Sequence, residues 1–257
     1  MSEPVVKPLE GRGVLVTGAS SGIGRAIAVA AARAGADVAL TYRSNASGAR
    51  ETEAHIRALS QKAITFQIDL ADEGALASLG ASARDALGRL DAWINNAGAD
   101  ILTGAGASMS DVQKMDLLMS VDLRGTILAS WQAASVLAKQ PDGGVIINMS
   151  WDHVLTGMPG LNPQLFAAVK GGVLAFSKSL ARSVAPRVRV NIVAPGWIET
   201  SFGTSLDDDL RRRIAESAPL RRWGTPDDVA GATVFLASPA AAFLTGQTIL
   251  VGGGVVM

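Results

Sequence analysis

A glycine-rich segment close to the N-terminus has the residue types and the spacing of a phosphate-binding turn. Three glycines recur within residues 17–24, between an apolar run at 13–16 and an alanine-rich run at 25–33. This order predicts a strand, a turn and a helix. Such a turn directs backbone N–H groups and the positive end of a helix dipole toward an anion. A tight turn without a ligand has the same pattern, but we interpret the segment as a nucleotide-binding turn. The predicted contacts are Thr17, Gly18, Ser20, Ser21, Gly22, Ile23 and Gly24.

Further apolar runs of strand length alternate with segments of helical periodicity along the whole chain. The helical segments lie at about 25–33, 49–60, 72–87, 108–139 and 165–184, and the later strands at 37–42, 63–68, 91–94, 144–149, 188–193 and 248–251. Strands that alternate with helices of this length predict an α/β fold. We expect a doubly wound, parallel, seven-stranded sheet with helices on both faces, a Rossmann fold. Residues 1–10 are interpreted as a loose tail and 11–257 as one domain.

Ligands of such sheets bind outside the carboxyl ends of the strands, so the residues that follow each strand are the candidate site. We expect these strand ends to meet in one crevice. After the glycine turn they are Tyr42-Arg43, Asp69-Leu70, Asn95-Asn96-Ala97-Gly98, Ser150-Trp151 and Ala194-Pro195-Gly196.

The composition argues against several other classes of protein. The 23 basic and 23 acidic residues cancel, which gives no electrostatic reason to expect nucleic acid as a partner. The chain has no cysteine and two histidines, so neither a disulfide framework nor a metal site is expected. No apolar run has the length of a membrane span, and the N-terminus lacks the features of a signal peptide. The expectation is a soluble cytoplasmic protein that acts on a small molecule.

From about residue 11 to 257 the chain resembles the short-chain dehydrogenase/reductase superfamily. The matching motifs are Thr17-Gly18-x-x-x-Gly22-x-Gly24, Asp69-Leu70, Asn95-Asn96-Ala97-Gly98, Arg189-Val190-Asn191, Pro195-Gly196-x-x-x-Thr200 and Thr245-Gly246-Gln247. The resemblance implies a nicotinamide dinucleotide cofactor bound at these motifs. It implies that Asp69 holds the adenine amino group, that Asn95 lies against the adenosine ribose, and that Ile198 and Thr200 lie at the nicotinamide carboxamide. It also implies contacts from Leu70, Ala97, Gly98, Lys170, Pro195 and Gly196.

Two larger features also follow from the resemblance. Residues 200–223 correspond to a lid over the substrate. The helices at 120–139 and 165–184 correspond to the pair that joins subunits in similar proteins, so a homo-oligomer, a tetramer or dimer, is expected.

Arg43 bears on which dinucleotide is bound. Members of the superfamily that prefer NAD(H) usually carry an acidic residue at the end of the second strand, where this chain has Tyr42, followed by Arg43 and Ser44. A guanidinium fork beside a hydroxyl suits a 2′-phosphate. We therefore predict NADP(H) rather than NAD(H); the alternative is a solvated arginine in a loop.

The predicted catalytic centre departs from the pattern of the superfamily. That pattern is Tyr-x-x-x-Lys, with a serine about 13 residues before the tyrosine. The register that retains the lysine is Phe166-Ala167-Ala168-Val169-Lys170, and Trp151 falls where the serine would be, with Ser150 before it. Phe166 and Lys170 share one helix face, but a phenylalanine has no proton to donate.

The side chains that remain as catalytic candidates are Lys170, Asp122, Asp152 and His153. Asp122 stands where the family usually has asparagine. It could hold the Lys170 ammonium and order a water between them, or replace the amide as a structural hydrogen-bonding group. His153 titrates in a range useful for proton transfer, or else is a loop histidine beside Asp152.

These observations lead to two hypotheses. The first is an NADP(H)-dependent reductase of a carbonyl or an activated C=C bond that works without the tyrosine and the serine. The second is a dinucleotide-binding protein that has lost redox activity and serves as a scaffold, sensor or subunit.

Overall fold

The computed structural model describes residues 7–204 and 206–257, and within them the chain forms one seven-stranded parallel sheet. The order of the strands is β3-β2-β1-β4-β5-β6-β7, so the winding reverses between β1 and β4. This confirms the predicted α/β fold. The strands are β1 (Gly13–Val16), β2 (Asp37–Tyr42), β3 (Ala63–Gln67), β4 (Ala92–Asn95), β5 (Gly144–Met149), β6 (Val188–Pro195) and β7 (Thr248–Val251).

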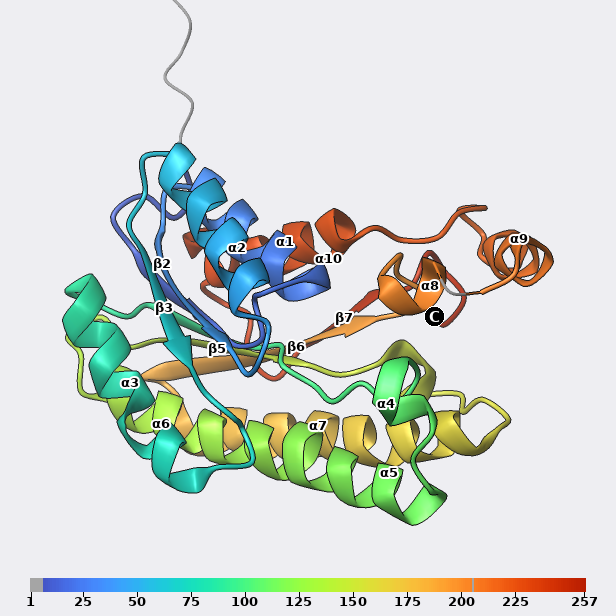
Figure 1. Cartoon of the computed structure of the whole chain (residues 1–257). Coiled ribbons are helices and arrows are strands. Elements are labelled where there is room, and N and C mark those ends of the chain that lie inside the picture. Colours follow the sequence, from blue (N-terminus) through green and yellow to red (C-terminus); the bar gives the residue numbers. More distant parts are fainter. Residues whose placement is uncertain (1–6, 205) are drawn as a thin grey trace, which may run out of the picture.

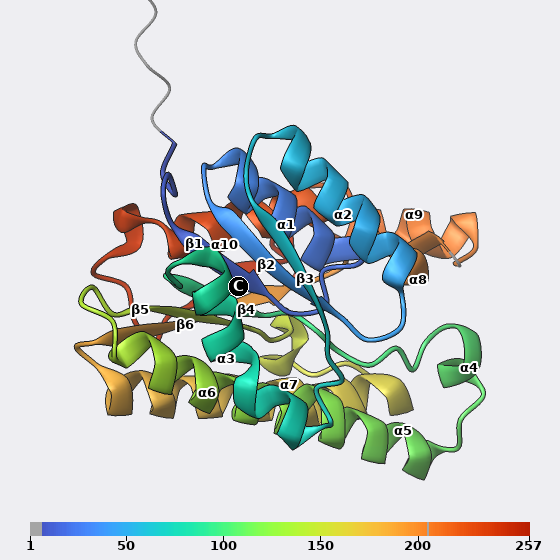
Figure 2. The same cartoon turned by 60° about the vertical axis from the view of Figure 1, so that its left-hand side comes forward.

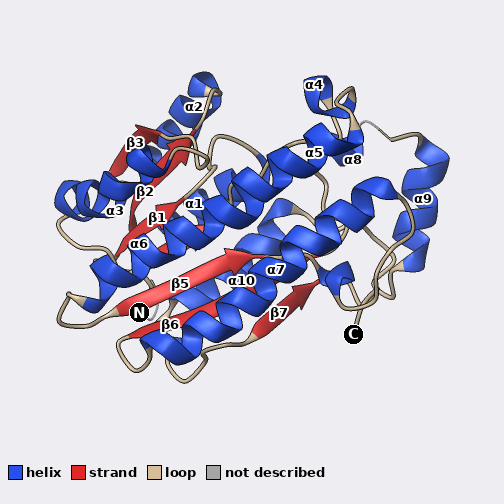
Figure 3. Cartoon of the chain, turned by 90° about the horizontal axis from the view of Figure 1, so that it is seen from below, coloured by secondary structure: helices blue, strands red, loops and turns tan. Residues whose placement is uncertain are grey.

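Helices cover both faces of the sheet (Figures 1 and 2). One layer contains α1 (Gly22–Arg33), α2 (Ala46–Ala58) and α10 (Pro226–Ala237). The other contains α3 (Glu73–Leu87), α5 (Asp111–Leu118), α6 (Thr126–Ala138) and α7 (Leu161–Val184); Figure 3 shows α6 and α7 running along β5 and β6. The short elements are α4 (Gly104–Ala107), α8 (Ser201–Thr204), α9 (Asp208–Ser217), and the 3₁₀ turns η2 (Asp152–Val154) and η3 (Pro239–Ala241).

The alternation of side chains along the strands divides the core into two layers. Val14 and Val16 of β1 pack under α1 and α10, whereas Leu15 and Trp93 face the layer of α3 and α6. The tail predicted at 1–10 lies partly outside the described residues. Within its described part, Leu9 is buried and its N–H donates to the Ala34 carbonyl, so this part contacts the domain.

Local capping explains where two helices begin. Sequence reasoning places a break at 44–48, but α2 begins at Ala46 because the Asn45 side chain accepts a hydrogen bond from the Gly48 N–H. Helix α7 begins at Leu161, before the predicted 165, because Pro163 lies in the first turn, where proline is tolerated.

The long helix predicted at 108–139 contains a segment of π-helix, η1 (Met119–Gly125), between α5 and α6. Here the helix approaches the loop after β3: a Cβ on Gly125 would lie 2.9 Å from both Leu70 Cβ and the Leu70 carbonyl oxygen. Val121 and Asp122 are buried in this segment. Insertions of this kind often occur at functional sites.

Among the described residues, no helix combines the length and the apolar character needed to cross a membrane.

Candidate functional site

The glycine turn between β1 and α1 is packed tightly against the loop that follows β4. Gly18 has a φ of +65°, and a Cβ there would lie 2.7 Å from Ala97 Cα. A Cβ on Gly24 would lie 2.2 Å from the Gly18 carbonyl oxygen. The Thr17 hydroxyl oxygen accepts hydrogen bonds from the N–H groups of Asn96 (3.0 Å) and Ala97 (3.1 Å). Glycine is therefore required at both positions for reasons of space.

The N-terminus of α1 leaves its backbone donors free for a ligand. Ser21 is the N-cap residue, but its side chain makes no capping hydrogen bond, and the first turn contains no acidic residue. The first N–H groups of a helix have no partner within the helix. This arrangement, at the edge of a cavity, suits a phosphate group.

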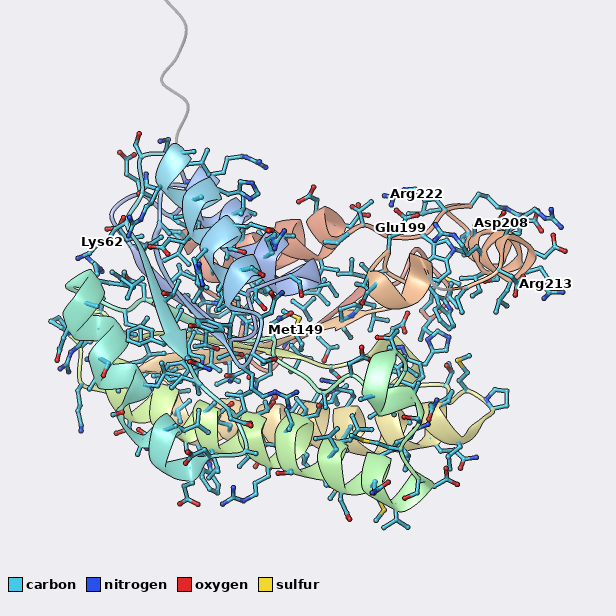
Figure 4. The ribbon with its side chains drawn as sticks, viewed as in Figure 1. Lys62, Met149, Glu199, Asp208, Arg213 and Arg222 are labelled. Atoms are coloured by element: carbon cyan, nitrogen blue, oxygen red, sulfur yellow. The ribbon has the colours of Figure 1, made fainter. Side chains whose placement is uncertain are left out.

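Two cavities meet at the carboxyl edge of the sheet. The first, of about 740 Å³, extends from the glycine turn past the ends of β2, β3 and β4. The second, of about 460 Å³, lies beside the ends of β5 and β6 and the first half of α7. Ile23, Asn96 and Thr200 line both cavities, so the two are joined. Met149, at the end of β5 and in the wall of the second cavity, lies near the centre of the molecule (Figure 4).

Most of the predicted cofactor residues line these cavities. Those in the first are Gly18, Ser20, Ser21, Gly22, Ile23, Gly24, Arg43, Asp69, Leu70, Ala97, Gly98 and Thr200. Those in the second are Ile23, Lys170, Pro195, Gly196, Ile198 and Thr200. Asn96 was not among the predicted contacts, although it lies in the motif that contains Asn95. The alternation of side chains along β4 is the signal that could have found it.

The structure corrects the predictions for Asn95 and Thr17. Asn95 is 2% exposed; its amide accepts a hydrogen bond from Trp93 Nε1 (2.8 Å) and donates to the Asn148 amide oxygen (2.8 Å). Residues two apart on a strand face the same side, so Asn95 follows Trp93 into the core. Thr17 is also buried, and it braces the loop after β4. Neither residue is in the described lining of the two joined cavities.

Arg43 lies on the exposed rim of the first cavity, next to Ser44 and Asn45. Asn45 is committed to capping α2, and the Arg43 carbonyl accepts a hydrogen bond from Gln67 Nε2 (3.0 Å). The backbone at Arg43 is thus tied to β3, while its side chain stays at the cavity rim.

Lys170 and the buried Asp122 form an ion pair. Lys170 Nζ lies 2.8 Å from Asp122 Oδ2, and the two side chains are 12% and 2% exposed. The other carboxylate oxygen of Asp122 accepts a hydrogen bond from the Ala99 N–H (2.7 Å). Asp122 therefore contacts the lysine and accepts a backbone hydrogen bond at the same time. The contact is direct, so no water lies between the two charges.

Phe166, Trp151 and Ser150 surround Lys170 in the second cavity. The Phe166 and Trp151 rings meet edge to face, with centroids 6.4 Å apart. The Ser150 hydroxyl donates to the Lys170 carbonyl (2.8 Å), so this serine fixes β5 to α7. Lys170 is the one ionisable side chain among the described residues that line this cavity.

The structure also corrects the predictions for Asp152 and His153. Both are buried, and neither is among the described residues that line the two joined cavities. Asp152 Oδ1 lies 2.6 Å from His153 Nδ1, and the imidazole stacks on Trp151 at 5.0 Å between centroids. His153 also meets Trp197 edge to face. The pair therefore packs behind two tryptophans of the wall of the second cavity instead of facing that cavity.

Asp152 occupies a space that two glycines leave open. A Cβ on Gly196 would lie 2.4 Å from Asp152 Oδ2, and a Cβ on Gly252 would lie 2.1 Å from the same atom. Oδ2 has no hydrogen-bond partner in the described part of the chain. Burial raises the pKa of the Asp152 carboxyl, and the hydrogen bond and charge of His153 oppose that rise.

We expect Asp152→Asn to stabilise the protein at neutral pH but not at low pH. Because the folded-state pKa of Asp152 is raised, its favourable contribution is complete below the ordinary value of 3.8 and is lost as the pH rises through the folded-state value. The free energy of unfolding of the variant, minus that of the wild type, should therefore grow as the pH rises from about 4 toward neutrality. Urea denaturation across this range measures it. A difference independent of pH would contradict the prediction.

The segment predicted as a lid contains α8 and α9, and α9 extends away from the sheet, as the positions of Asp208 and Arg213 show in Figure 4. Arg211 connects α9 to the body. Its guanidinium lies 5.8 Å from the centroid of the Trp223 ring and donates to the Gly203 carbonyl, and Trp223 Nε1 donates to the Arg211 carbonyl. Trp223 in turn meets Trp197, which lines the second cavity.

Together, the reversal of the sheet, the open helix N-terminus and the joined cavities define a dinucleotide-binding protein with the Rossmann fold. Within the described ranges, no group of three or more His, Asp or Glu side chains is placed to hold a metal ion.

Comparison with known proteins shows that the chain belongs to the short-chain dehydrogenase/reductase superfamily. Residues 18–256 match a family model described as enoyl-(acyl carrier protein) reductase. An L-rhamnose 1-dehydrogenase (NAD(P)(+)) from Sphingomonas sp. (strain SKA58) is 37% identical over 252 residues, covering 97% of this chain and 98% of the relative. A 3-oxoacyl-[acyl-carrier-protein] reductase from Synechocystis sp. is 36% identical, with 95% and 96% covered.

Solved structures agree with this assignment. A putative short-chain alcohol dehydrogenase from Sinorhizobium meliloti 1021 has a TM-score of 0.88 at 37% identity, covering 97% of this chain and 98% of that one. A short chain dehydrogenase from Burkholderia cenocepacia J2315, solved in complex with NADP, has a TM-score of 0.86 at 33% identity, with 96% and 99% covered. The relatives are named as dehydrogenases and reductases, and the protein is an oxidoreductase enzyme of this superfamily.

Proposed function

We propose that the protein is an NADP(H)-dependent reductase of a carbonyl compound or an activated C=C bond, and that the Lys170–Asp122 pair activates the substrate. One observation carries the proposal: Lys170 lies in the wall of the second cavity, and its Nζ is 2.8 Å from the buried carboxylate of Asp122. The resemblance to the superfamily implies that Phe166 and Trp151 take the places of the usual tyrosine and serine. The ion pair keeps the positive charge of Lys170 beside the space for the substrate. This charge would act on the substrate where the superfamily usually uses a tyrosine hydroxyl.

The residues of the first cavity suit the cofactor. The open N-terminus of α1 would hold the pyrophosphate, with Gly18, Gly22 and Gly24 giving it room. Asp69 and Leu70 would contact the adenine, and Ile198 and Thr200 the nicotinamide carboxamide. When bound, NADPH supplies the hydride for reduction. The B. cenocepacia structure solved with NADP and the rhamnose dehydrogenase named for NAD(P)(+) support this cofactor.

The side chains in the second cavity define which groups the protein itself contributes to the reduction. Phe166 and Trp151 have no readily transferable proton, and the Ser150 hydroxyl donates to the backbone of α7. Lys170 is left to donate a hydrogen bond to the substrate carbonyl oxygen, while Asp122 orients the ammonium group. Reduction of a C=C bond conjugated to that carbonyl requires only this polarisation, with the proton at the α-carbon taken from water. Reduction of the carbonyl itself requires Lys170 to donate a proton as well.

The proposal is tested by following the oxidation of NADPH in the presence of ketones, enones and enoyl thioesters, with NADPH binding measured separately by fluorescence. Turnover of at least one of these classes is the expected result. Tight binding of NADPH without turnover of any of them would favour a protein that binds the dinucleotide without redox chemistry.

For the cofactor, we expect Arg43→Ala to weaken the binding of NADPH about tenfold or more and to leave the binding of NADH nearly unchanged. The guanidinium lies at the rim of the first cavity and is suited to a charge-assisted contact with the 2′-phosphate, which NADH lacks. Fluorescence titration with each cofactor measures the effect. Arg50→Ala, at an exposed arginine of α2, is the matched control. Equal losses for NADPH and NADH in Arg43→Ala would remove the argument for a 2′-phosphate contact.

We also propose that residues 200–223 act as a lid over the substrate. Copies of this chain would associate through α6 and α7. Met119 and Trp131 are 45% and 56% exposed on this layer, where they line a cavity of about 570 Å³. Trp131 of α6 meets Phe176 of α7 edge to face, so both helices contribute to the apolar face. Light scattering of the purified protein measures the number of copies.

A further inference from the structure

The second cavity runs along α7, with polar groups at both ends. Asn162, Phe166 and Lys170 all line it and lie four residues apart. Residues at this spacing share one helix face, and eight residues of α-helix span about 12 Å. A ligand with one end at Lys170 would therefore pass over Phe166 before it reaches Asn162.

The middle of the cavity has aromatic walls. Trp151, Phe166 and Trp197 line it. Trp151 is held between Phe166, at 6.4 Å, and the stacked imidazole of His153, at 5.0 Å; Trp197 is held by His153 and Trp223. Rings fixed by one another in this way form a preorganised apolar surface, which favours a flat, rigid ligand.

At the far end lies Asn162, whose side chain makes no hydrogen bond to the part of the chain that the structure describes. Its Oδ1 atom is buried and unpaired, and no described residue receives a hydrogen bond from its amide nitrogen. An unpaired buried polar atom costs free energy, which a ligand can recover by pairing with it. The terminal torsion of asparagine is soft, so rotation can present either the oxygen or the nitrogen to the cavity.

The charges and the remaining polar groups limit what else can bind. Lys170 is the single ionisable side chain in the described lining, and Asp122 already pairs with it. The Asn96 amide donates to the carbonyls of Thr17 and Gly18. A sugar would bury several hydroxyls against few free partners, and an anionic group would find no unpaired cation.

We propose that this cavity selects an uncharged, flat, fused-ring or aryl ketone or enone that carries a second oxygen at its far end, and that Asn162 recognises this second oxygen. The reacting carbonyl lies at Lys170, the rings lie between Trp151, Phe166 and Trp197, and the second oxygen pairs with the Asn162 amide. This inference rests on the proposed reductase function, because it assigns the substrate of the same site.

Binding is the test, measured by quenching of tryptophan fluorescence in the presence of NADP⁺, so that no reduction occurs. The probes are testosterone, whose enone oxygen and hydroxyl lie at opposite ends of a rigid ring system, its analogue without the hydroxyl, and a crotonyl thioester. We expect testosterone to bind about tenfold more tightly than the deoxy analogue and more tightly still than the thioester. Thioester binding that exceeds that of both ring compounds would overturn the proposal.

Asn162→Leu tests the residue itself, and Gln164→Leu is the matched control, since Gln164 is exposed on the same turn of α7. The preference for testosterone over its deoxy analogue should fall to within about twofold in Asn162→Leu and remain about tenfold in the control. A preference retained in Asn162→Leu would overturn the role of this residue.

Turnover separates this proposal from the one on which it rests. If the ring compounds bind in the expected order but NADPH is not consumed, the cavity assignment holds and the reductase function fails. If the thioester is reduced and neither ring compound binds, the reductase function holds and the cavity assignment fails.

Discussion

Lys170→Met is expected to lower kcat by about 10³-fold or more with any substrate that the wild type reduces. Lys170 is the only ionisable side chain in the described lining of the substrate cavity, so its removal takes away both the proton donor and the positive charge at the carbonyl oxygen. Methionine has a similar length and keeps the apolar packing of the stem. Steady-state oxidation of NADPH measures the loss.

Two measurements make this result specific. Lys170→Arg keeps the charge beside Asp122 and should retain part of the activity, because polarisation of the carbonyl survives even if proton transfer does not. Far-UV circular dichroism of both variants shows whether the fold is intact. Full activity in Lys170→Met would show that another group activates the substrate and would refute the assignment of this site.

Asp122→Ala is expected to destabilise the protein by about 3 kcal/mol, because it leaves the Lys170 ammonium buried without its partner. The Ala99 N–H, which donates to Asp122 Oδ1, also loses its acceptor. Asp122→Asn should cost less, since its amide oxygen can still accept from Ala99, although catalysis should slow because the charge of the partner is gone. Urea denaturation and steady-state kinetics of the two variants separate the structural role from the electrostatic one.

The double variant Asp122→Ala/Lys170→Met isolates the ion pair. Removal of both charges leaves no unpaired charge, so the unfolding free energy of the double variant should exceed that of Asp122→Ala alone. The double variant should still lack activity. If the two single losses in stability simply add in the double variant, the two side chains do not interact energetically.

Most residues predicted to contact the cofactor line a cavity, whereas of the four catalytic candidates Lys170 alone is in the described lining of the two cavities, and the reason is local. Gly18 and Gly24 lie in a motif that folds within one strand, one turn and one helix, so their roles follow from the spacing. The predictions for Asn95 and His153 depend on which way a side chain faces. Asn95 lies on the core side of β4, whereas Asn96 reaches the cavities, and a shift of one residue along a strand changes the side.

Contacts between distant parts of the chain explain the other differences between the sequence predictions and the structure. Asp152 is buried because Gly196 and Gly252, from two other strand ends, leave room for its carboxylate. Neither glycine is near Asp152 in sequence, so its burial and its raised pKa follow only from the packed structure. Asn162 was not among the predicted residues, because only the path of α7 along the cavity brings it into line with Lys170.

Periodicity, glycine spacing and residue identity are properties of short segments, so the sequence alone was enough to predict the fold and the phosphate-binding turn and to align Phe166 with the usual tyrosine of the superfamily. The packed structure was needed to show that Lys170 and Asp122 are in direct contact, that His153 packs against Trp151 and Trp197, and that aromatic rings line the second cavity. These features depend on side chains from different helices and strand ends, such as Lys170 and Asp122 or Trp197 and Trp223, which meet only when those elements pack together.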